Sequence, residues 1–448
     1  MFLIKNATII NKGRSFVGSV LVKNEIIKSI FENEQEIVVD GKYDEIDANG
    51  KLLIPGVIDD HVHFREPGLT HKGDIYSESR AAVAGGITSF MEMPNTVPQT
   101  VSIKTLEEKF AIAAQKSFAN YSFYIGATND NFEELKKINP AEICGVKVFM
   151  GSSTGNMLVD NNETLSRIFA EIPLLIAIHS EDEEIINRNK IYYQNLLGNE
   201  IPTTYHPLIR SAEACYKSTA QAIELATKLG TRLHVLHLST ANELDFFDCN
   251  KPLKDKKITA EACVHYLWFS DADYEKYGNR IKCNPAIKTE QDCLALQAAV
   301  NSGKIDIVAT DHAPHLFAEK QGNCLTSVSG MPLVQHSLSA MLQLVKQGIF
   351  TYEKVVEKMC HAPAELFGIE KRGFIREGYF ADLVLIDPEK MWTVTSENIL
   401  YRCAWSPFEN ETFNHTVETT WVNGQKVYDK GIFNENTRGK SLKFKLRV

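Results

Sequence analysis

Short apolar runs alternate with helical patterns through the middle of the chain. Eight of these runs are typical of buried strands, and they cover residues 56–63, 87–93, 121–126, 146–150, 174–179, 232–238, 258–263 and 305–311. The clearest helical pattern runs from Ser211 to Leu229, where a serine can cap the start and Gly230 can end the helix. About eight strand–helix repeats over about 300 residues favour a (β/α)8 TIM-type barrel. A doubly wound open sheet is the alternative, but no Gly-x-Gly-x-x-Gly turn follows a predicted strand.

The two ends of the chain show a different pattern, with short strands and turns. A strand is predicted from Ala381 to Asp387, ending at Pro388, and residues 420–428 form a predicted hairpin around Asn423-Gly424. We therefore predict a small β-sandwich-like domain built from both chain ends. Its segments are residues 1–55 and 372–448, and the barrel takes residues 56–371.

Composition narrows the class of protein. A chain of 448 residues suggests one large domain with an accessory one, and 44% hydrophobic and 23% charged residues are ordinary for a soluble globular protein. The net charge of −9, without a long basic block, argues against nucleic acid or an anionic membrane as a partner. No apolar run approaches the roughly 18 residues of a membrane helix.

The N-terminus and the cysteines point to a compartment. The first residues, from Met1 to Asn6, are typical of a strand and lack the charged-then-apolar pattern of a signal peptide. Nine cysteines are scattered without a Cys-x-x-Cys pair, so neither a disulfide framework nor a thiolate zinc site is indicated. We expect reduced thiols and a cytoplasmic protein.

Two histidines stand at the end of the first predicted barrel strand. His61 and His63 are two residues apart, so in a strand their side chains point to the same face and can reach one metal ion. Arg65 follows them and would place a cation for an anionic substrate beside that metal. The motif is short, and a chance pairing of surface histidines is the competing interpretation.

Other predicted strand ends carry residues of the same kind. Lys147 lies in the apolar run 145–150, while His179, His237 and Asp311 each close a later strand. Each residue alone has a simpler interpretation, as a cap, a turn, a core residue or an edge residue. Together they fall on the face of a barrel where active sites are built. Imidazole and carboxylate groups without thiolates suit zinc or a similar divalent ion in a catalytic site.

Five motifs spread along the barrel are similar to those of a known family. They are Asp-x-His-x-His-x-Arg-x-Pro-Gly from Asp59 to Gly68, Met93-Pro94-Asn95-Thr96, His237-Leu238-Ser239-Thr240, Asn284-Pro285, and Thr310-Asp311-His312-Ala313-Pro314-His315. On these motifs the chain resembles the amidohydrolase superfamily and, within it, the dihydroorotases. The β-rich chain ends also resemble the composite accessory domain of that superfamily.

The resemblance implies a centre of two divalent metal ions, zinc in the family's usual form, with six ligands. The ligands implied are His61, His63 and Asp311 for the more buried ion, His179 and His237 for the second, and Lys147 as a bridge. Lys147 would have to be carboxylated, because an ammonium group has donors but no acceptor. Burial in an apolar strand favours the neutral amine that captures carbon dioxide.

The resemblance also implies an activity, the reversible hydrolysis of dihydroorotate to N-carbamoyl-aspartate in pyrimidine biosynthesis. Asp311 would carry a proton from the attacking water to the ring nitrogen. Arg65 would bind the exocyclic carboxylate of the ring through a two-pronged contact. Asn95, His315 and Asn284 match the family's other substrate contacts. We expect a homodimer from the family alone.

Three alternatives stay open. Allantoinases are similar around Glu66-Pro67-Gly68 but usually lack an arginine at position 65, and dihydropyrimidinases carry a tyrosine where this chain has Gly151 to Thr154. A non-catalytic homologue that partners aspartate transcarbamoylase would have lost metal ligands. The polar segment from Leu316 to Ser329 is a candidate mobile loop over the site.

Overall fold

The computed structural model describes residues 1–33, 37, 39, 41–150 and 157–445, and its centre is a parallel barrel. Its eight strands are hydrogen-bonded in chain order, β6 to β13. They are β6 (Val57–Val62), β7 (Ile87–Glu92), β8 (Asn120–Gly126), β9 (Gly145–Phe149), β10 (Ile176–His179), β11 (Leu233–Val235), β12 (Ile258–Cys263) and β13 (Ile307–Ala309). A parallel bridge between Val62 and His312 brings the last strand back to the first, so the predicted TIM-type barrel is confirmed.

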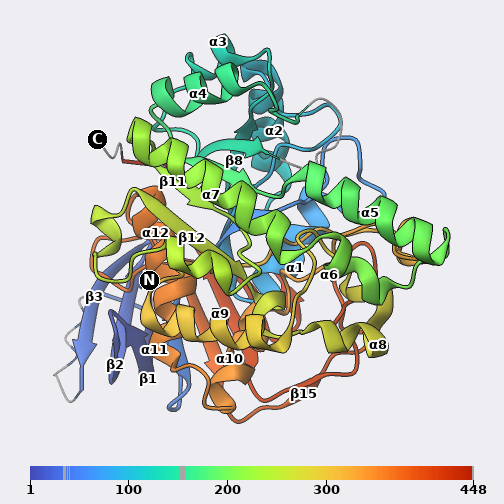
Figure 1. Cartoon of the computed structure of the whole chain (residues 1–448). Helices are drawn as coiled ribbons and strands as arrows, with labels where there is room; N and C mark the ends of the chain where they lie inside the picture. Colours follow the sequence, from blue (N-terminus) through green and yellow to red (C-terminus); the bar gives the residue numbers. More distant parts are fainter. Residues whose placement is uncertain (34–36, 38, 40, 151–156, 446–448) are drawn as a thin grey trace.

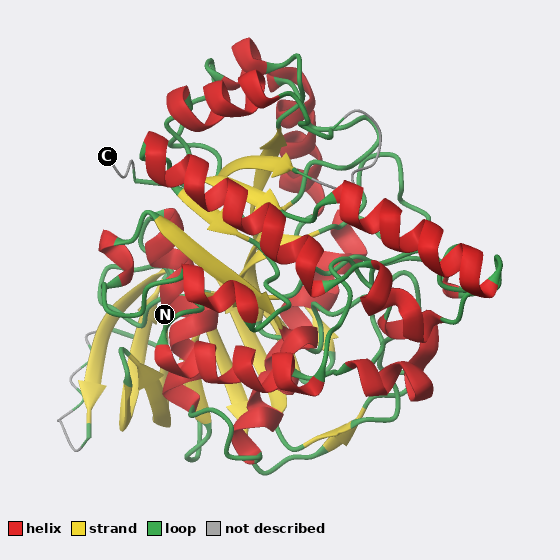
Figure 2. Ribbon diagram, viewed as in Figure 1, coloured by secondary structure: helices red, strands yellow, loops and turns green. Residues whose placement is uncertain are grey.

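Helices surround the strands, as Figures 1 and 2 show. They are α1 (Ile75–Ala84), α2 (Ile103–Lys116), α3 (Phe132–Leu135), α4 (Asn162–Glu171), α5 (Glu183–Leu197), α6 (His206–Ile209), α7 (Ala212–Leu229), α8 (Tyr274–Tyr277), α9 (Glu290–Ser302), α10 (Ser337–Lys346), α11 (Tyr352–Val356) and α12 (Ala362–Phe367). The connection from β11 to β12 departs from the repeat, because it holds only the short 3-10 turns Asn242–Phe246 and Leu253–Asp255. Within the described residues, no helix combines the length and apolar character needed to cross a membrane.

The predicted helix at 211–229 forms with the predicted caps. The Ser211 side chain accepts a hydrogen bond from the backbone N–H of Ala214, which satisfies one of the free donors at the start of α7. Gly230 ends the helix at φ 72°, a left-handed conformation that costs glycine little. Ser211 and Gly230 therefore bound α7, the longest helix among the described residues.

Two barrel strands are shorter than the apolar pattern predicts. β11 ends at Val235, although Leu236 and Leu238 follow it, and β13 ends at Ala309, short of the predicted end at residue 311. The backbone leaves the extended conformation soon afterwards, with φ 42° at His237 and φ 48° at Asp311. Left-handed backbone at non-glycine residues interrupts a strand, and it turns these two side chains toward the mouth of the barrel.

The chain ends meet in one nine-stranded sheet beside the barrel. Its strands are β1 (Phe2–Asn11), β2 (Arg14–Lys23), β3 (Ile26–Glu32), β4 (Asp44–Asp47), β5 (Leu52–Pro55), β14 (Leu383–Asp387), β17 (Thr416–Val422), β18 (Gln425–Asp429) and β19 (Ile432–Phe433). The join is the antiparallel pair of β5 and β14, with Leu53 opposite Leu385. In Figure 1 the blue strands β1 to β3 lie to one side of the barrel. A second small sheet pairs β15 (Trp392–Thr393) with β16 (Thr412–Phe413).

Candidate functional site

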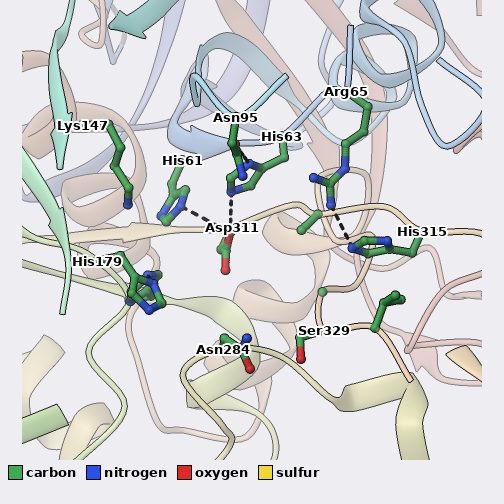
Figure 3. Close-up of a pocket in the computed structure, with 14 residues that line it drawn as sticks. His61, His63, Arg65, Asn95, Lys147, His179, Asn284, Asp311, His315 and Ser329 are labelled. Atoms are coloured by element: carbon green, nitrogen blue, oxygen red, sulfur yellow. Dashed lines mark hydrogen bonds and ion pairs between the residues drawn. The ribbon is translucent and has the colours of Figure 1, made fainter. Parts of the chain in front are cut away.

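A cavity of about 430 Å³ opens at the carboxyl ends of the barrel strands (Figure 3). All ten side chains proposed from the sequence line it: His61, His63, Arg65, Asn95, Lys147, His179, His237, Asn284, Asp311 and His315. The remaining wall comes from Ala313 and from Val328, Ser329 and Gly330. The barrel therefore brings these residues together, as expected for parallel strands that end on one face.

The first group of candidate ligand atoms is centred on Asp311. Its Oδ1 lies 3.3 Å from Nε2 of His61 and 3.1 Å from Nε2 of His63. The three side chains each offer one atom within a cluster whose members lie within 4.8 Å of one another. Two imidazole nitrogens and a carboxylate oxygen converging in this way suit a divalent ion.

The other ring nitrogens of these two histidines are occupied by partners. Nδ1 of His61 lies 3.0 Å from Oε1 of Glu261, and Nδ1 of His63 lies 2.7 Å from Oδ1 of Asn95. Each ring therefore donates from Nδ1 to an oxygen, which leaves the lone pair on Nε2. This outer contact is the usual way in which proteins orient a histidine toward a metal.

A second pair of histidines completes the opposite side of the cavity. Nδ1 of His179 faces Nε2 of His237 at 2.9 Å, and Nε2 of His179 lies 3.0 Å from Oε2 of Glu181. Glu181 is also paired with Arg210, and together these partners hold the pKa of the buried carboxyl near 2 against the effect of burial. A charged carboxylate here fixes the Nε2–H tautomer of His179, so its Nδ1 offers a lone pair.

Lys147 projects from β9 toward the same space as His61 and His179 (Figure 3). Its side chain is buried, and burial lowers the pKa of the amine to about 7, against the opposing effect of the Asp311 and Glu261 carboxylates. A large share of the side chain is therefore neutral near neutral pH. Only the neutral amine has a lone pair that can react.

The remaining ionisation states also fit a metal centre. Burial lowers the pKa of His63 to about 4, and it lowers the pKa of His179 and, more strongly, of His237. Burial acts in the same direction on His61, but the Glu261 and Asp311 carboxylates outweigh it and raise its pKa. Charges that favour a proton on this ring would favour a divalent cation beside it. These imidazole and carboxylate groups therefore fit a site that binds divalent metal ions.

The wall of the cavity at Arg65 is cationic. Arg65 donates from Nε to the carbonyl of Pro314 at 3.1 Å, and its Nη2 lies 3.0 Å from Nε2 of His315. Burial lowers the pKa of Arg65 to about 10, so the guanidinium stays charged at neutral pH. Asn284 lies across the cavity, where its Oδ1 is 3.2 Å from Nε2 of His206. An anionic group would be held at the Arg65 side of the cavity.

Three supporting residues were not assigned from the sequence. Glu261 lies in β12 and supports His61, Glu181 supports His179, and Lys72 lies 3.1 Å from Nδ1 of His315. Glu181 stands two residues after a predicted ligand, which is a usable signal. Glu261 lies within a predicted strand and Lys72 within a predicted loop. Nothing in the sequence around either residue indicates a role in the site.

Other sequence expectations have mixed outcomes. The stretch 151–154, which lacks the tyrosine of dihydropyrimidinases, lies outside the described residues. His234, which lies three residues before His237, is buried, and its Nδ1 lies 2.8 Å from Thr259 Oγ1. The segment 316–329 lies over the site and is tied down by Lys320, whose Nζ donates to the carbonyls of Val328 and Gly330.

Comparisons with known proteins agree with this geometry. The sequence matches the amidohydrolase family over residues 52–427. A dihydroorotase from Methanosarcina acetivorans is 34% identical over 418 residues, which are 91% of this chain and 87% of the relative. An allantoinase from Bacillus velezensis is 31% identical over 440 residues, or 96% and 94% of the two chains. Among solved structures, an L-hydantoinase (dihydropyrimidinase) from Arthrobacter aurescens has a TM-score of 0.90 at 26% identity, over 97% of this chain and 98% of that one.

Proposed function

The chain belongs to the amidohydrolase family, and from this membership and the geometry of the cavity we propose that it is a dihydroorotase. It is a hydrolase of cyclic amides, and its proposed reaction is the reversible opening of dihydroorotate to N-carbamoyl-aspartate, a step of pyrimidine biosynthesis. The protein from Methanosarcina acetivorans, 34% identical over most of both chains, bears the same name.

The Arg65–His315 pair carries the choice of substrate. Dihydroorotate has an exocyclic carboxylate, whereas the rings of allantoin and hydantoin are opened without one. Arg65 and His315, 3.0 Å apart, both line the cavity. A buried guanidinium gains most from a carboxylate that it can bind through two hydrogen bonds. A ring without an anionic group would leave this cation unpaired.

We further propose zinc as the metal and carboxylation of Lys147. His61, His63 and Asp311 would hold one ion, and His179 and His237 the other. Attack of the neutral Lys147 amine on carbon dioxide forms an N–C bond, releases a proton from nitrogen and leaves a carbamate that can bridge both ions. When bound, such ions lower the pKa of a coordinated water from about 15.7 to about 7 and polarise a carbonyl.

The residues of the chain then position the ring and move its proton. Arg65, His315 and the amide of Asn95 would bind the exocyclic carboxylate, and Asn284 would contact the ring amide. Oδ1 of Asp311 faces both His61 and His63, so Oδ2 is the oxygen left to take a proton from the attacking water. Asp311 would pass this proton to the leaving ring nitrogen.

The domain bounds, the compartment and the oligomeric state complete the proposal. The composite β domain is proposed to comprise residues 1–55 and 372–448, and the barrel residues 56–371. All nine cysteines are unpaired, which supports a reducing compartment such as the cytoplasm. A homodimer is proposed from the family alone.

The test is a substrate comparison on the purified, metal-loaded protein. Ring opening of dihydroorotate, allantoin, hydantoin and dihydrouracil would be followed separately, together with ring closure of N-carbamoyl-aspartate. We expect turnover of dihydroorotate and of N-carbamoyl-aspartate, with the uncharged rings far slower. Turnover of allantoin alone would overturn the proposal in favour of an allantoinase.

A metal count separates the enzyme from a non-catalytic homologue. The cavity holds all six proposed ligands, so about two metal ions per chain are expected by elemental analysis. A protein that binds no metal and turns over none of these rings would instead support a role as a partner of aspartate transcarbamoylase.

A further inference from the structure

The imidazole of His315 lies between two cations. Nζ of Lys72 is 3.1 Å from its Nδ1, and Nη2 of Arg65 is 3.0 Å from its Nε2. Figure 3 shows the contact with Arg65, at the wall of the cavity. Lysine and arginine side chains are donors only, so both would need a lone pair on the same ring.

A neutral imidazole cannot satisfy both cations. Burial lowers the pKa of His315 most, and the charges of Arg65 and Lys72 lower it further, so the ring is neutral at neutral pH. A neutral ring has one N–H and one lone pair. One cation therefore donates to the ring, while the other faces an N–H group of the ring instead of a lone pair.

The surroundings favour a hydrogen bond from Lys72 to Nδ1. Lys72 is held at 2.7 Å by Oε1 of Glu319 and is not one of the residues that line the cavity, whereas Arg65 and His315 both line it. A ligand that enters the cavity can bring an acceptor to the Nε2 edge of the ring but not to the Nδ1 edge. If Nε2 carries the proton, it faces the Arg65 donor, and a substrate acceptor can satisfy both groups. If Nδ1 carried the proton, it would face the Lys72 donor, and no substrate group could reach them.

The backbone beside the ring supplies a further acceptor. A Cβ added at Gly330 would meet Cδ2 of His315 at 3.1 Å, so the segment 329–330 packs against the ring edge that adjoins Nε2. The carbonyl of Ser329 raises the pKa of His315, which means that it favours a proton on the ring. An acceptor on the segment that packs at this edge favours a proton on the ring.

We propose that Lys72 is a positioning residue that donates to Nδ1 of His315 and fixes its Nε2–H tautomer, so that His315 and Arg65 act as two donors for one substrate carboxylate. The proposal rests on the proposed function for the identity of the carboxylate. It explains why a cation is placed behind the ring, where it cannot touch substrate. It also makes Lys72 a determinant of preference for a carboxylated ring over an uncharged one.

Kinetics of the metal-loaded enzyme test the consequence for binding. Lys72→Met keeps the length of the side chain and removes the donor, so we expect KM for dihydroorotate to rise about 10-fold or more while kcat and metal content change little. Lys72→Arg keeps a donor and should recover part of the loss. Lys137→Met is the matched control, because Lys137 also pairs with a glutamate, at 2.8 Å, but lies on the surface away from the cavity.

Glu319→Gln separates this role from a merely structural ion pair. If Lys72 acted only by holding Glu319, then Glu319→Gln would reproduce the KM of Lys72→Met, and the proposal would be overturned. An unchanged KM in Lys72→Met would overturn it as well. We expect Glu319→Gln to stay within a few-fold of the wild type.

The tautomer of His315 can be measured by NMR, without an activity assay. In protein labelled with ¹⁵N-histidine, the His315 signals are identified by their loss in His315→Gln, and long-range ¹H–¹⁵N spectra show which nitrogen carries the proton. We expect Nε2–H in the wild type and loss of that preference in Lys72→Met. An active enzyme with the proton on Nδ1 would overturn the inference and leave the proposed function standing. A protein inactive on dihydroorotate that shows the expected tautomer change would support the role of Lys72 and contradict the proposed function.

Discussion

Oε1 of Glu261 accepts a hydrogen bond from Nδ1 of His61 at 3.0 Å. The same oxygen accepts from the backbone N–H of His237 at 3.0 Å and lies 3.1 Å from the thiol of Cys263. One carboxylate oxygen therefore supports a histidine in each half of the proposed metal centre. In His237 it holds the backbone, which has left-handed φ at 42°, rather than the ring.

Glu261→Gln should weaken both halves of the centre together. Glutamine keeps the shape but replaces the charged acceptor by a weaker one, and outer partners of metal-bound histidines typically contribute about 10- to 100-fold in metal affinity or activity. We expect both metal ions to be lost to a chelator at lower concentration than in the wild type. Elemental analysis after graded chelator treatment measures this.

Glu243→Gln is the matched control for that experiment. Glu243 is also fully buried, but its oxygens accept from Thr219 and Thr240 and contact none of the proposed ligands. Its metal content should stay at the wild-type level. Loss of one ion with full retention of the other in Glu261→Gln would contradict the shared support described above.

Lys147→Ala should lose metal and rate together. The substitution removes the amine that the proposal converts to a bridging carbamate, and alanine cannot supply an anionic ligand. A small carboxylate such as acetate or propionate, added with metal, should restore part of the activity because it can occupy the space left by the side chain. Activity and metal content are measured with and without the added acid. Full activity of Lys147→Ala without rescue would show that no bridge is needed at this position.

Arg65→Ala should keep the metal and lose the preference for a carboxylated ring. Charge-assisted hydrogen bonds contribute about 1.5–3 kcal/mol, which corresponds to a rise in KM for dihydroorotate of about 10- to 100-fold. Arg65→Lys should recover little, because a lysine cannot make the two-pronged contact. KM for dihydroorotate and metal content are the measurements, with Arg188→Ala, an exposed arginine paired with Glu213, as the control. Metal loss in Arg65→Ala would place Arg65 in the metal centre instead.

The sequence predicts the ring of ligands because their positions depend on a simple rule. His61, Lys147, His179 and Asp311 follow or lie in apolar strands, and parallel strands that close into a barrel end on the same face. The order of strands then brings residues 250 positions apart into contact. A pattern read along the chain is sufficient for this part of the site.

The supporting residues are not predictable in this way. Glu261 becomes a partner of His61 only through the register of β12 beside its neighbours, where it lies opposite Ile307 of β13. Left-handed backbone at Arg65, His237 and Asp311 also opposes local propensity, because residues with a Cβ rarely adopt it. These contacts depend on the register of neighbouring strands and on backbone conformations that the residues do not favour by themselves. Both are set by the whole fold, so they cannot be predicted from the local sequence.

Lys109→Met should destabilise the barrel through a buried pair. Nζ of Lys109 lies 2.9 Å from Oε2 of Glu92 and donates to the carbonyl of Met93 at 2.9 Å, with both charged side chains fully buried. Removing one partner of such a pair costs about 3–5 kcal/mol, because the other is left buried without compensation. Urea unfolding measures the change in free energy of unfolding. Adding Glu92→Leu to Lys109→Met should recover much of the loss, and no recovery would show that the pair is not the cause.

His336→Gln should flatten the acid dependence of stability. Burial, and then the charge of His312, lowers the pKa of His336 to about 3 in the folded protein, whereas an unfolded histidine titrates near 6.5. Between these values the unfolded chain binds a proton that the native ring does not, so stability is complete above about pH 6.5 and falls as the pH decreases. One such group contributes about 1.4 kcal/mol per pH unit well below pH 6.5.

The slope of unfolding free energy between pH 6 and pH 4, from urea titrations, should decrease by about that amount in the variant. Equal slopes in His336→Gln and the wild type would show that the native ring takes up its proton in the same range as the unfolded one.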